Sequence, residues 1–250
     1  MNPTDLKIVT VSVNSRLDLR VCIKSEELME WLGNFKGVSF KEKKNNKDPS
    51  KRDRFFNCIM FYYETENIGY RIHIKIFQNG SVQIAGIKTN DMEKIDEIMI
   101  SILNVIKQAT IAYPENITLN SENISDTRIT MINSNYCIDP EKKWKINQKK
   151  LQTLINENHR IENNGLWKGI TKKDTYPALN GKFISSSRIE NYNPNLKKKM
   201  DGEVTVLIFR SGSIIITGFS KWEYACEAYE NVNSIIRENF DNVCFIDKLA

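Results

Sequence analysis

The sequence predicts an α+β protein built from two tandem αβ repeats. Residues 74–88 (IKIFQNGSVQIAGIK) and 206–220 (VLIFRSGSIIITGFS) align without a gap. Both segments alternate apolar and polar residues around a glycine-containing turn, a pattern typical of a β-hairpin. A segment with apolar residues at helical spacing follows each hairpin. Self-similarity on this scale indicates a duplicated unit.

The two hairpins match at their turns and at their apolar positions. The identical pairs are Phe77/Phe209, Gly80/Gly212, Ser81/Ser213 and Gly86/Gly218. Alternate residues of a strand point to opposite faces. One face should therefore pack on a core, and it holds Ile74, Ile76, Val82 and Ile84 in the first hairpin and Val206, Ile208, Ile214 and Ile216 in the second. The other face of each hairpin is left for a different role.

The remaining elements follow the same order in both halves. In the first half we expect a strand at 7–13, a helix at 25–32, the hairpin, and a helix at 91–107 with Met92, Ile95, Met99, Leu103 and Ile106 on its apolar face. In the second half we expect a strand at 129–132, a helix at 147–156, the hairpin, and a helix at 221–238. These elements predict a first repeat at 1–112, a polar linker at 113–127 and a second repeat at 128–250.

Composition narrows the class of protein. The chain has 250 residues and a net charge of +5, which is a mild tilt toward polyanionic partners. No run reaches the roughly 18 apolar residues of a membrane span, and the N-terminus does not resemble a secretory signal. The five cysteines form no CxxC pair, which favours a reducing compartment. We therefore expect an intracellular protein.

Signals of catalysis are weak. The sequence has two histidines, His73 and His159, and neither has a cysteine or acidic partner at metal-ligand spacing. It also lacks the P-loop, GxSxG and GxGxxG motifs. We expect no enzyme activity, no metal and no cofactor, although a nuclease built from dispersed carboxylates stays open as an alternative.

Residues 206–232 (VLIFRSGSIIITGFSKWEYACEAYENV) resemble the second-repeat signature of the TATA-box-binding protein (TBP) family. The likeness includes a strand ending in LIF, an SG turn, a strand ending in TG and an aromatic-Glu-Asn triplet at 229–231. RFFNCIM at 54–60 is similar to the RFAAVIM strand of the family, and YPAL at 176–179 is similar to its FPGL. The differences from the family motifs and a composition rich in Lys, Asn and Ile suggest a viral or protist member.

The resemblance implies a fold and a function. The strands would form one curved antiparallel sheet, a saddle, with helices on the convex side and double-stranded DNA against the concave side. The chain would be a transcription initiation factor that binds and bends A·T-rich promoter DNA through the minor groove. Its further partners would be a transcription factor IIB-like protein and RNA polymerase, in the nucleus or at a viral transcription site. An architectural or protein-interaction module without promoter specificity is the alternative.

The resemblance also assigns DNA-binding residues. Phe55 and Phe77 would be the wedge pair of the first repeat, and Tyr176 and Phe209 that of the second. A one-residue slip would exchange Phe55 with Phe56. The other expected contacts are Thr205, Leu207, Ile215 and Thr217 in the second repeat, Lys75 and Gln83 in the first, and Val11, Val13, Thr130 and Ile132 on the first strands. Two registers are possible for the first strand of each repeat. The better one places Val11 and Thr130 at the positions where the family has minor-groove asparagines, and it leaves Asn14 and Asn133 out of phase with the DNA.

Two further segments allow alternative interpretations. Residues 41–54 are rich in basic side chains and predict either a solvated loop or a phosphate-contacting arm. The chain between Tyr176 and Phe209 is longer than that between Phe55 and Phe77, with the excess around 186–200. By resemblance the extra length enlarges the second stirrup, the loop that overhangs the edge of the DNA, where the family docks its transcription factor IIB. An inert insertion is the alternative.

Overall fold

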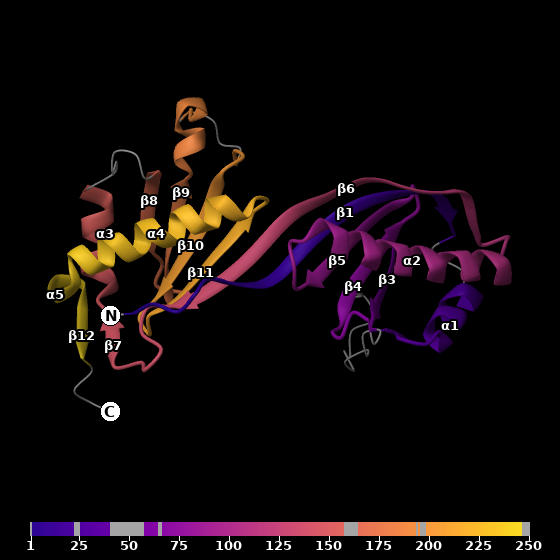
Figure 1. Ribbon diagram of the computed structural model, residues 1–250, viewed down its shortest axis with the longest axis horizontal. Helices are drawn as coiled ribbons and strands as arrows, with labels where there is room; N and C mark the ends of the chain where they lie inside the picture. Colours follow the sequence, from indigo (N-terminus) through magenta and orange to yellow (C-terminus); the bar gives the residue numbers. More distant parts are fainter. Residues whose placement is uncertain are drawn as a thin grey trace. The chain divides into compact units, whose positions relative to one another are not determined.

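The computed structural model describes residues 2–22, 26–40, 58–64, 67–157, 165–193, 195 and 199–246. The chain divides into two compact units. The N-terminal unit is Val11–Thr130, and the C-terminal unit combines Met1–Thr10 with Met131–Ala250. Both units mix helices with antiparallel strands (Figure 1), so the predicted α+β class is confirmed.

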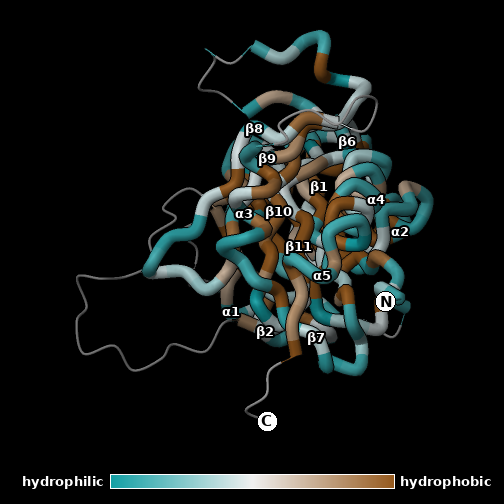
Figure 2. Tube along the Cα trace, turned by 90° about the vertical axis from the view of Figure 1, so that its left-hand side faces the viewer, coloured by the Kyte–Doolittle hydropathy of each residue, from teal (hydrophilic) through white to brown (hydrophobic). Residues whose placement is uncertain are grey.

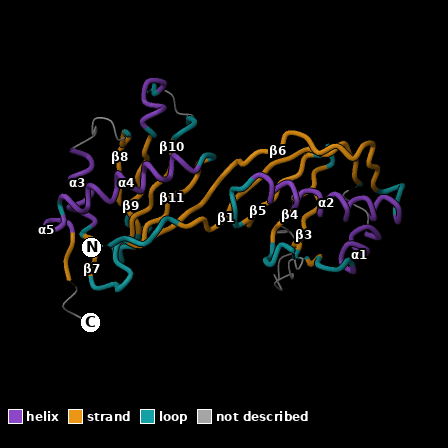
Figure 3. Tube along the Cα trace, in the orientation of Figure 1, coloured by secondary structure: helices purple, strands orange, loops and turns teal. Residues whose placement is uncertain are grey.

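Each half of the chain runs through strand, helix, strands and long helix in the same order (Figure 3). The first half contains β1 (Lys7–Val21), α1 (Glu26–Asn34), β2 (Val38–Ser39), β3 (Cys58–Tyr63), β4 (Ile72–Phe77), β5 (Ser81–Ile87) and α2 (Met92–Ala112). The second half contains β6 (Ile117–Cys137), β7 (Trp144–Ile146), α3 (Gln148–Glu157), β8 (Leu166–Lys172), β9 (Ala178–Ile184), η2 (Ser186–Asn191), β10 (Glu203–Phe209), β11 (Ser213–Phe219), α4 (Trp222–Glu238), α5 (Phe240–Val243) and β12 (Cys244–Ile246).

The main sheet hydrogen-bonds in the order β2-β3-β4-β5-β1-β6-β11-β10-β9-β8, and β12 pairs with β7 separately. The paired strands are antiparallel. In the N-terminal unit α2 runs across one face of β3, β4 and β5, and in the C-terminal unit α4 runs across β10 and β11 (Figure 1).

Burial in the hairpins alternates as the sequence predicts. Ile74, Ile76, Val82 and Ile84 are buried in the N-terminal unit, as are Val206, Ile208, Ile214 and Ile216 in the C-terminal unit. Figure 2 shows the hydrophobic character of β10 and β11. Fully burying one such aliphatic side chain stabilises the fold by about 1.5–3 kcal/mol, so the eight positions provide much of the core.

The turn between β4 and β5 requires glycine. Gly80 has φ +83°, and a Cβ there would lie 2.1 Å from the Leu17 carbonyl oxygen. The Gly80 amide donates to the Phe77 carbonyl, and its carbonyl accepts from the Leu17 amide at 2.9 Å. The turn is therefore closed on itself and tied directly to β1.

The signature triplet of α4 holds the C-terminal unit together. Asn231 is buried, and its Oδ1 accepts from Nε1 of the buried Trp167 at 2.9 Å. Tyr229 packs edge-on against Tyr136, and its hydroxyl donates to the carbonyl of Thr4 at 3.1 Å. A buried indole N–H without a partner is costly, which explains a buried asparagine at this position.

The expected linker is wrong for residues 117–127, because β6 begins at Ile117. This part of β6 is polar, so its sequence lacks the apolar alternation of a strand. It is held instead by polar bonds to β1: Asn120 Nδ2 donates to Asp18 Oδ1 at 3.0 Å, and the Ser15 and Thr127 hydroxyls lie 2.9 Å apart.

Two smaller expectations also need correction. The first strand continues to Val21, beyond the predicted end at residue 13. Met92, which we placed on the apolar face of its helix, is 39% exposed, because it is the first residue of α2 and the buried face begins at Ile95. The other four predicted apolar residues of that helix are buried.

Candidate nucleic-acid interface

Each unit presents one strand face that α2 or α4 does not cover, and we call it the open face. In the N-terminal unit it contains His73, Lys75, Phe77, Gln83 and Ala85. In the C-terminal unit it contains Thr205, Leu207, Phe209, Ile215 and Thr217. All ten residues are partly exposed, whereas their strand neighbours in the other phase are mostly buried. The structure therefore groups the hairpin residues predicted to contact DNA on one face of each unit.

The strand register fixes which side chains lie side by side. Lys75 is opposite Gln83 and His73 is opposite Ala85. In the C-terminal unit Leu207 is opposite Ile215 and Thr205 is opposite Thr217. Residues directly opposite in an antiparallel pair are close enough to interact. The two open faces thus share a layout but differ in chemistry, with a polar and cationic centre in one and an apolar centre in the other.

A hollow of about 280 Å³ lies beside Phe77 on the N-terminal open face. Its lining includes Asn14, Arg16, Gln83 and Arg128. The two guanidinium groups outnumber the one carboxylate of the lining, that of Asp126. Together with the aromatic ring and the two carboxamides, they suit a ligand with a flat face and a negatively charged backbone. Sequence reasoning missed Arg16 and Arg128, because it ended the first strand at residue 13 and began the strand of the second half only at residue 129, whereas β6 begins at Ile117.

The other end of the N-terminal open face carries an aromatic stack. Tyr62 on β3 lies opposite His73, and their ring centroids are 4.9 Å apart. The Arg71 guanidinium lies 3.9 Å from the centre of the Tyr62 ring, and its Nη2 donates to Ser39 Oγ at 3.1 Å. Sequence reasoning missed Tyr62 and Arg71; the alternation of β3 was the signal that could have placed Tyr62 here.

Tyr176 and Phe209 are neighbours in the C-terminal unit. Their ring centroids are 6.4 Å apart with the planes tilted by 56°. Tyr176 lies in the loop before β9 and is 41% exposed. Lys172 Nζ donates to the carbonyls of Tyr176 and Pro177 at 3.3 and 2.9 Å, which fixes this loop. The structure thus brings this predicted pair together at the end of the open face.

Thr217 has a defined polar environment. Its hydroxyl donates to Asn133 Oδ1, and Asn133 Nδ2 in turn donates to Thr10 Oγ1 at 2.8 Å. Ala85, its counterpart in the first hairpin, lies opposite Ser12. The hydroxyl of Thr217 also retains acceptor capacity for a ligand donor, whereas Ala85 has no polar side-chain atom.

The assignment of Val11, Val13 and Ile132 to the DNA-facing surface is wrong, because all three are 0% exposed on the core side. Irregular pairing at Val11/Ser12 and at Thr217/Phe219 shifts the register, and sequence alignment could not detect it. Thr130 is exposed, and its hydroxyl donates to the Ser12 carbonyl at 3.1 Å.

The asparagines that we expected out of phase are in phase with the open faces. Asn14 lies opposite Gln83, and Asn133 lies opposite Thr217. Asn135, opposite Ile215, extends the second row. These carboxamides offer both donors and acceptors beside the wedge positions.

Lysines concentrate on the C-terminal open face. Lys182 Nζ donates to Thr205 Oγ1 at 2.5 Å, and Lys199 Nζ donates to the Gly218 carbonyl. Burial, and then the nearby charge of Lys182, lowers the pKa of Lys199. Lys168 forms an ion pair with Glu203 at 3.0 Å. The charge of Lys182 near Lys199 favours an anionic ligand at this part of the open face.

Several predicted residues lie outside the described part of the chain: Phe55, its alternative Phe56, the basic segment 41–54 and His159. Within the described residues, no group of three or more His, Cys, Asp or Glu side chains could hold a metal ion. Nor do the described helices include one with the length and apolar character required to cross a membrane.

No protein-family model matches the chain, whereas comparison with individual proteins finds similar ones. A mimivirus protein described as "TATA-box-binding protein-like" is 26% identical over 209 residues. The alignment covers 80% of this chain and 52% of the mimivirus protein, so the chain spans about half the length of that relative. The solved structure of TBP from Methanococcus jannaschii superimposes with a TM-score of 0.49 and 20% identity, covering 94% of this chain and 99% of that one.

Proposed function

We propose that this chain, a divergent member of the TATA-box-binding protein family, binds duplex DNA through its two open faces as a transcription initiation factor. The observation that carries the proposal is the matched placement of Phe77 and Phe209. Each is half-buried at the end of a strand, on the face opposite the core, at the same position of its hairpin. Because an aromatic ring lies outside the core at this position in both hairpins, we infer that the ring contacts a ligand.

The chemistry of the faces suits the minor groove of A·T-rich DNA. That groove carries little base-specific hydrogen-bonding information, and proteins enter it by pushing apolar side chains between base steps. TATA-box-binding proteins are the best-known example of this mode. Phe77, Phe209 and Tyr176 would act as wedges, and the surrounding carboxamides and Thr217 would meet base edges. Flexible pyrimidine–purine steps lower the cost of the bend.

Energy transfer between dyes at the two ends of a short A·T-rich duplex tests the proposal. Saturating protein is expected to shorten the end-to-end distance, because wedging kinks the duplex. A G·C-rich duplex of equal length is the matched control and should bend less. Binding at saturation without a change in distance would contradict the proposal.

The two open faces should read DNA unequally. Lys75→Ala is expected to lower affinity on all sequences and to reduce the salt slope by about 0.9, one phosphate contact. Thr217→Ala should instead relax preference at one or two base pairs, because it removes a hydroxyl that would turn from Asn133 Oδ1 to donate to a base-edge acceptor. Affinities for single-base variants of the site, measured at two salt concentrations, check both effects.

Lys94→Ala is the control for this pair, since Lys94 is exposed on α2 and its ammonium lies 3.9 Å from Asp91. It should change neither the slope nor the base preference. If either test variant lost discrimination equally in both half-sites, the proposed asymmetry would be wrong.

We further propose that the segment around η2 recruits a transcription factor IIB-like protein and, through it, RNA polymerase. The segment is anchored to α4: Arg188 pairs with Asp201 at 2.7 Å, and Tyr224 bonds to both residues. The Ser186 amide also donates to Glu227 Oε1 at 2.7 Å. Such a network presents the segment in one orientation, which is what a docking site requires.

Deletion of residues 186–198, which keeps Lys199, should abolish recruitment of a purified transcription factor IIB-like protein to the DNA-bound chain, with DNA affinity changed less than about threefold. A gel-shift titration with and without the partner protein measures both. Arg188→Ala, which loosens the anchor but keeps the segment, should weaken recruitment only partly. Loss of DNA binding with recruitment intact would instead identify the segment as a DNA clamp.

The polar centre of the N-terminal open face favours a second candidate function. Lys75 and Gln83 stand where the C-terminal unit has Leu207 and Ile215. A cationic, sequence-tolerant face suits an architectural protein that bends DNA without promoter choice. Selection of bound sites from random duplexes separates the two: a defined motif supports the initiation factor, and uniform A·T-rich output supports the architectural role.

A further inference from the structure

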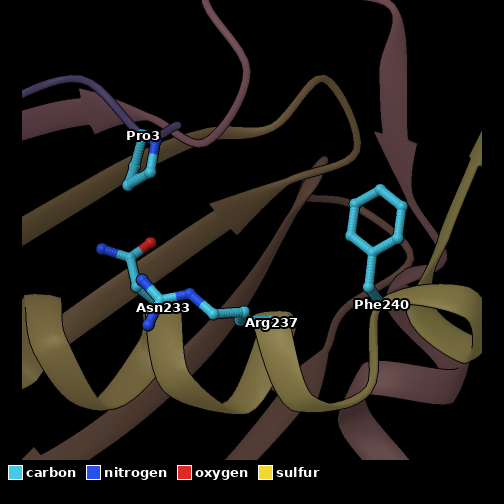
Figure 4. Close-up of a pocket in the computed structure, with 4 residues that line it drawn as sticks. All are labelled: Pro3, Asn233, Arg237 and Phe240. Atoms are coloured by element: carbon cyan, nitrogen blue, oxygen red, sulfur yellow. The ribbon is translucent and has the colours of Figure 1, made fainter. Parts of the chain in front are cut away.

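A small pocket lies on the helix side of the C-terminal unit, away from the open face. Its volume is about 140 Å³, and it is lined by Pro3, Asn233, Arg237 and Phe240 (Figure 4). Asn233 and Arg237 are one turn apart on α4, so their side chains share a helix face. Pro3 comes from the N-terminal segment, and Phe240 begins α5.

Asn233 is the unexplained residue of this pocket. Its side chain is 5% exposed, yet neither Oδ1 nor Nδ2 has a hydrogen-bond partner among the described residues. Figure 4 shows its carboxamide pointing from α4 toward Pro3. Leaving a buried carboxamide unpaired costs stability, and most buried polar groups are paired. An apolar residue of similar size would be the cheaper choice here, so the carboxamide is best explained by a ligand.

The walls of the pocket are fixed in advance. Next to Pro3, the Thr4 amide donates to the Cys137 carbonyl at 2.8 Å, and the Thr4 carbonyl accepts from Tyr229. Phe240 packs edge-on against Trp144 with ring centroids 4.7 Å apart. A ligand would therefore meet two preorganised ring surfaces at little entropic cost.

Arg237 is the charged residue among the four that line the pocket. Arg237 is exposed, and in the described part of the chain no carboxylate lies within ion-pair distance of it. Its neighbour Glu238 is engaged by the Ser234 hydroxyl at 2.6 Å. In Figure 4 the Arg237 side chain extends along α4 toward Asn233. Guanidinium and carboxamide donors on the same helix face match a carboxylate.

We propose that this pocket binds an acidic segment of a partner protein, with an aspartate carboxylate between Asn233 and Arg237. The main-chain N–H of the bound segment would satisfy Asn233 Oδ1, and Nδ2 would donate to the carboxylate. A cavity of this size accepts one ring-sized apolar side chain, which would lie between Pro3 and Phe240. The site is independent of the open faces, so DNA and the acidic segment could be held together.

Two dipeptide probes test the proposal on the full-length protein: acetyl-Phe-Asp-amide and its neutral isostere acetyl-Phe-Asn-amide. The aspartyl peptide is expected to shift the ¹⁵N–¹H signals of the Asn233 side-chain amide and to bind at least 10-fold more tightly than the asparaginyl peptide. Arg237→Gln, at an exposed position, should remove most of that difference. Lys221→Gln, at the other end of α4, should leave it unchanged.

Asn233→Leu separates binding from folding. It should abolish the aspartyl-peptide interaction and raise the thermal midpoint of the protein, because it removes an unpaired buried carboxamide without opening a cavity. Equal binding of the two peptides, or undiminished binding by Asn233→Leu, would overturn the proposal. The proposal would also be overturned if the Asn233 side-chain amide contacted only water when the protein is saturated with the aspartyl peptide.

Discussion

The double variant Phe77→Ala/Phe209→Ala is expected to lose most of its DNA bending while remaining folded. Both rings are half-buried on open faces, so truncation leaves no cavity in the core. Aromatic contacts with bases contribute about 1–3 kcal/mol each by alanine substitution, so affinity should fall by about 30-fold to 20,000-fold. Energy transfer across an end-labelled A·T-rich duplex gives the bend, and a titration gives the affinity.

Ile100→Ala/Ile111→Ala is the matched control for the phenylalanine pair. Both isoleucines are exposed on α2, at 52% and 82%, so their truncation also removes surface apolar area. It should leave bending and affinity within about twofold of the unmodified protein. A phenylalanine double variant that bends DNA normally would show that the rings are not wedges.

Gly80→Ala is expected to lower the free energy of unfolding by at least about 3 kcal/mol. A residue with a Cβ pays about 1–2 kcal/mol for a left-handed conformation. The new methyl group would also lie 2.1 Å from the Leu17 carbonyl oxygen, so β1 and the turn must separate. That movement would lengthen or break the hydrogen bond from the Leu17 amide to the Gly80 carbonyl. Urea denaturation followed by circular dichroism measures the loss.

Gly69→Ala isolates the conformational part of this cost. Gly69 also has a positive φ, +66°, but nothing lies within 4 Å of a Cβ built there. Its replacement should cost only about 1–2 kcal/mol. Equal destabilisation by the two substitutions would mean that the contact with β1 is relieved without cost.

The hairpins and long helices could be predicted because their local patterns are strong. The apolar alternation of β4, β5, β10 and β11 reflects one buried face per strand, and it placed Phe77 and Phe209 on the other face correctly. Helical periodicity predicted a helix at 221–238, one residue longer than the observed α4, Trp222–Glu238. Local sequence suffices where burial on one side determines every second residue.

The central strands could not be predicted in the same way. β6 is stabilised by polar contacts with β1, such as Asn120 with Asp18, and such contacts leave no periodic apolar signal. The sheet face on which Asn14 lies depends on an irregularity at Val11/Ser12 in the pairing of β1 with β5. This irregularity arises from contacts between strands that are distant in sequence, so the local sequence does not reveal it. Arg16 and Arg128 were missed for the same reason, although their basic character in a DNA-binding context was a usable hint.

The first ten residues belong to the C-terminal unit, and this has a consequence for how the protein is made. The bond between Tyr229 and Thr4 joins residues 225 apart in the chain, and Thr4 also bonds to Cys137. During synthesis the Thr4 amide has no partner until Cys137 has left the ribosome, and the Thr4 carbonyl has none until Tyr229 has left it. Contacts of such sequence separation slow folding, because the intervening chain must close a large loop first. A newly made N-terminal half therefore carries an unmatched strand end, which is a hazard for aggregation that a chaperone would need to cover.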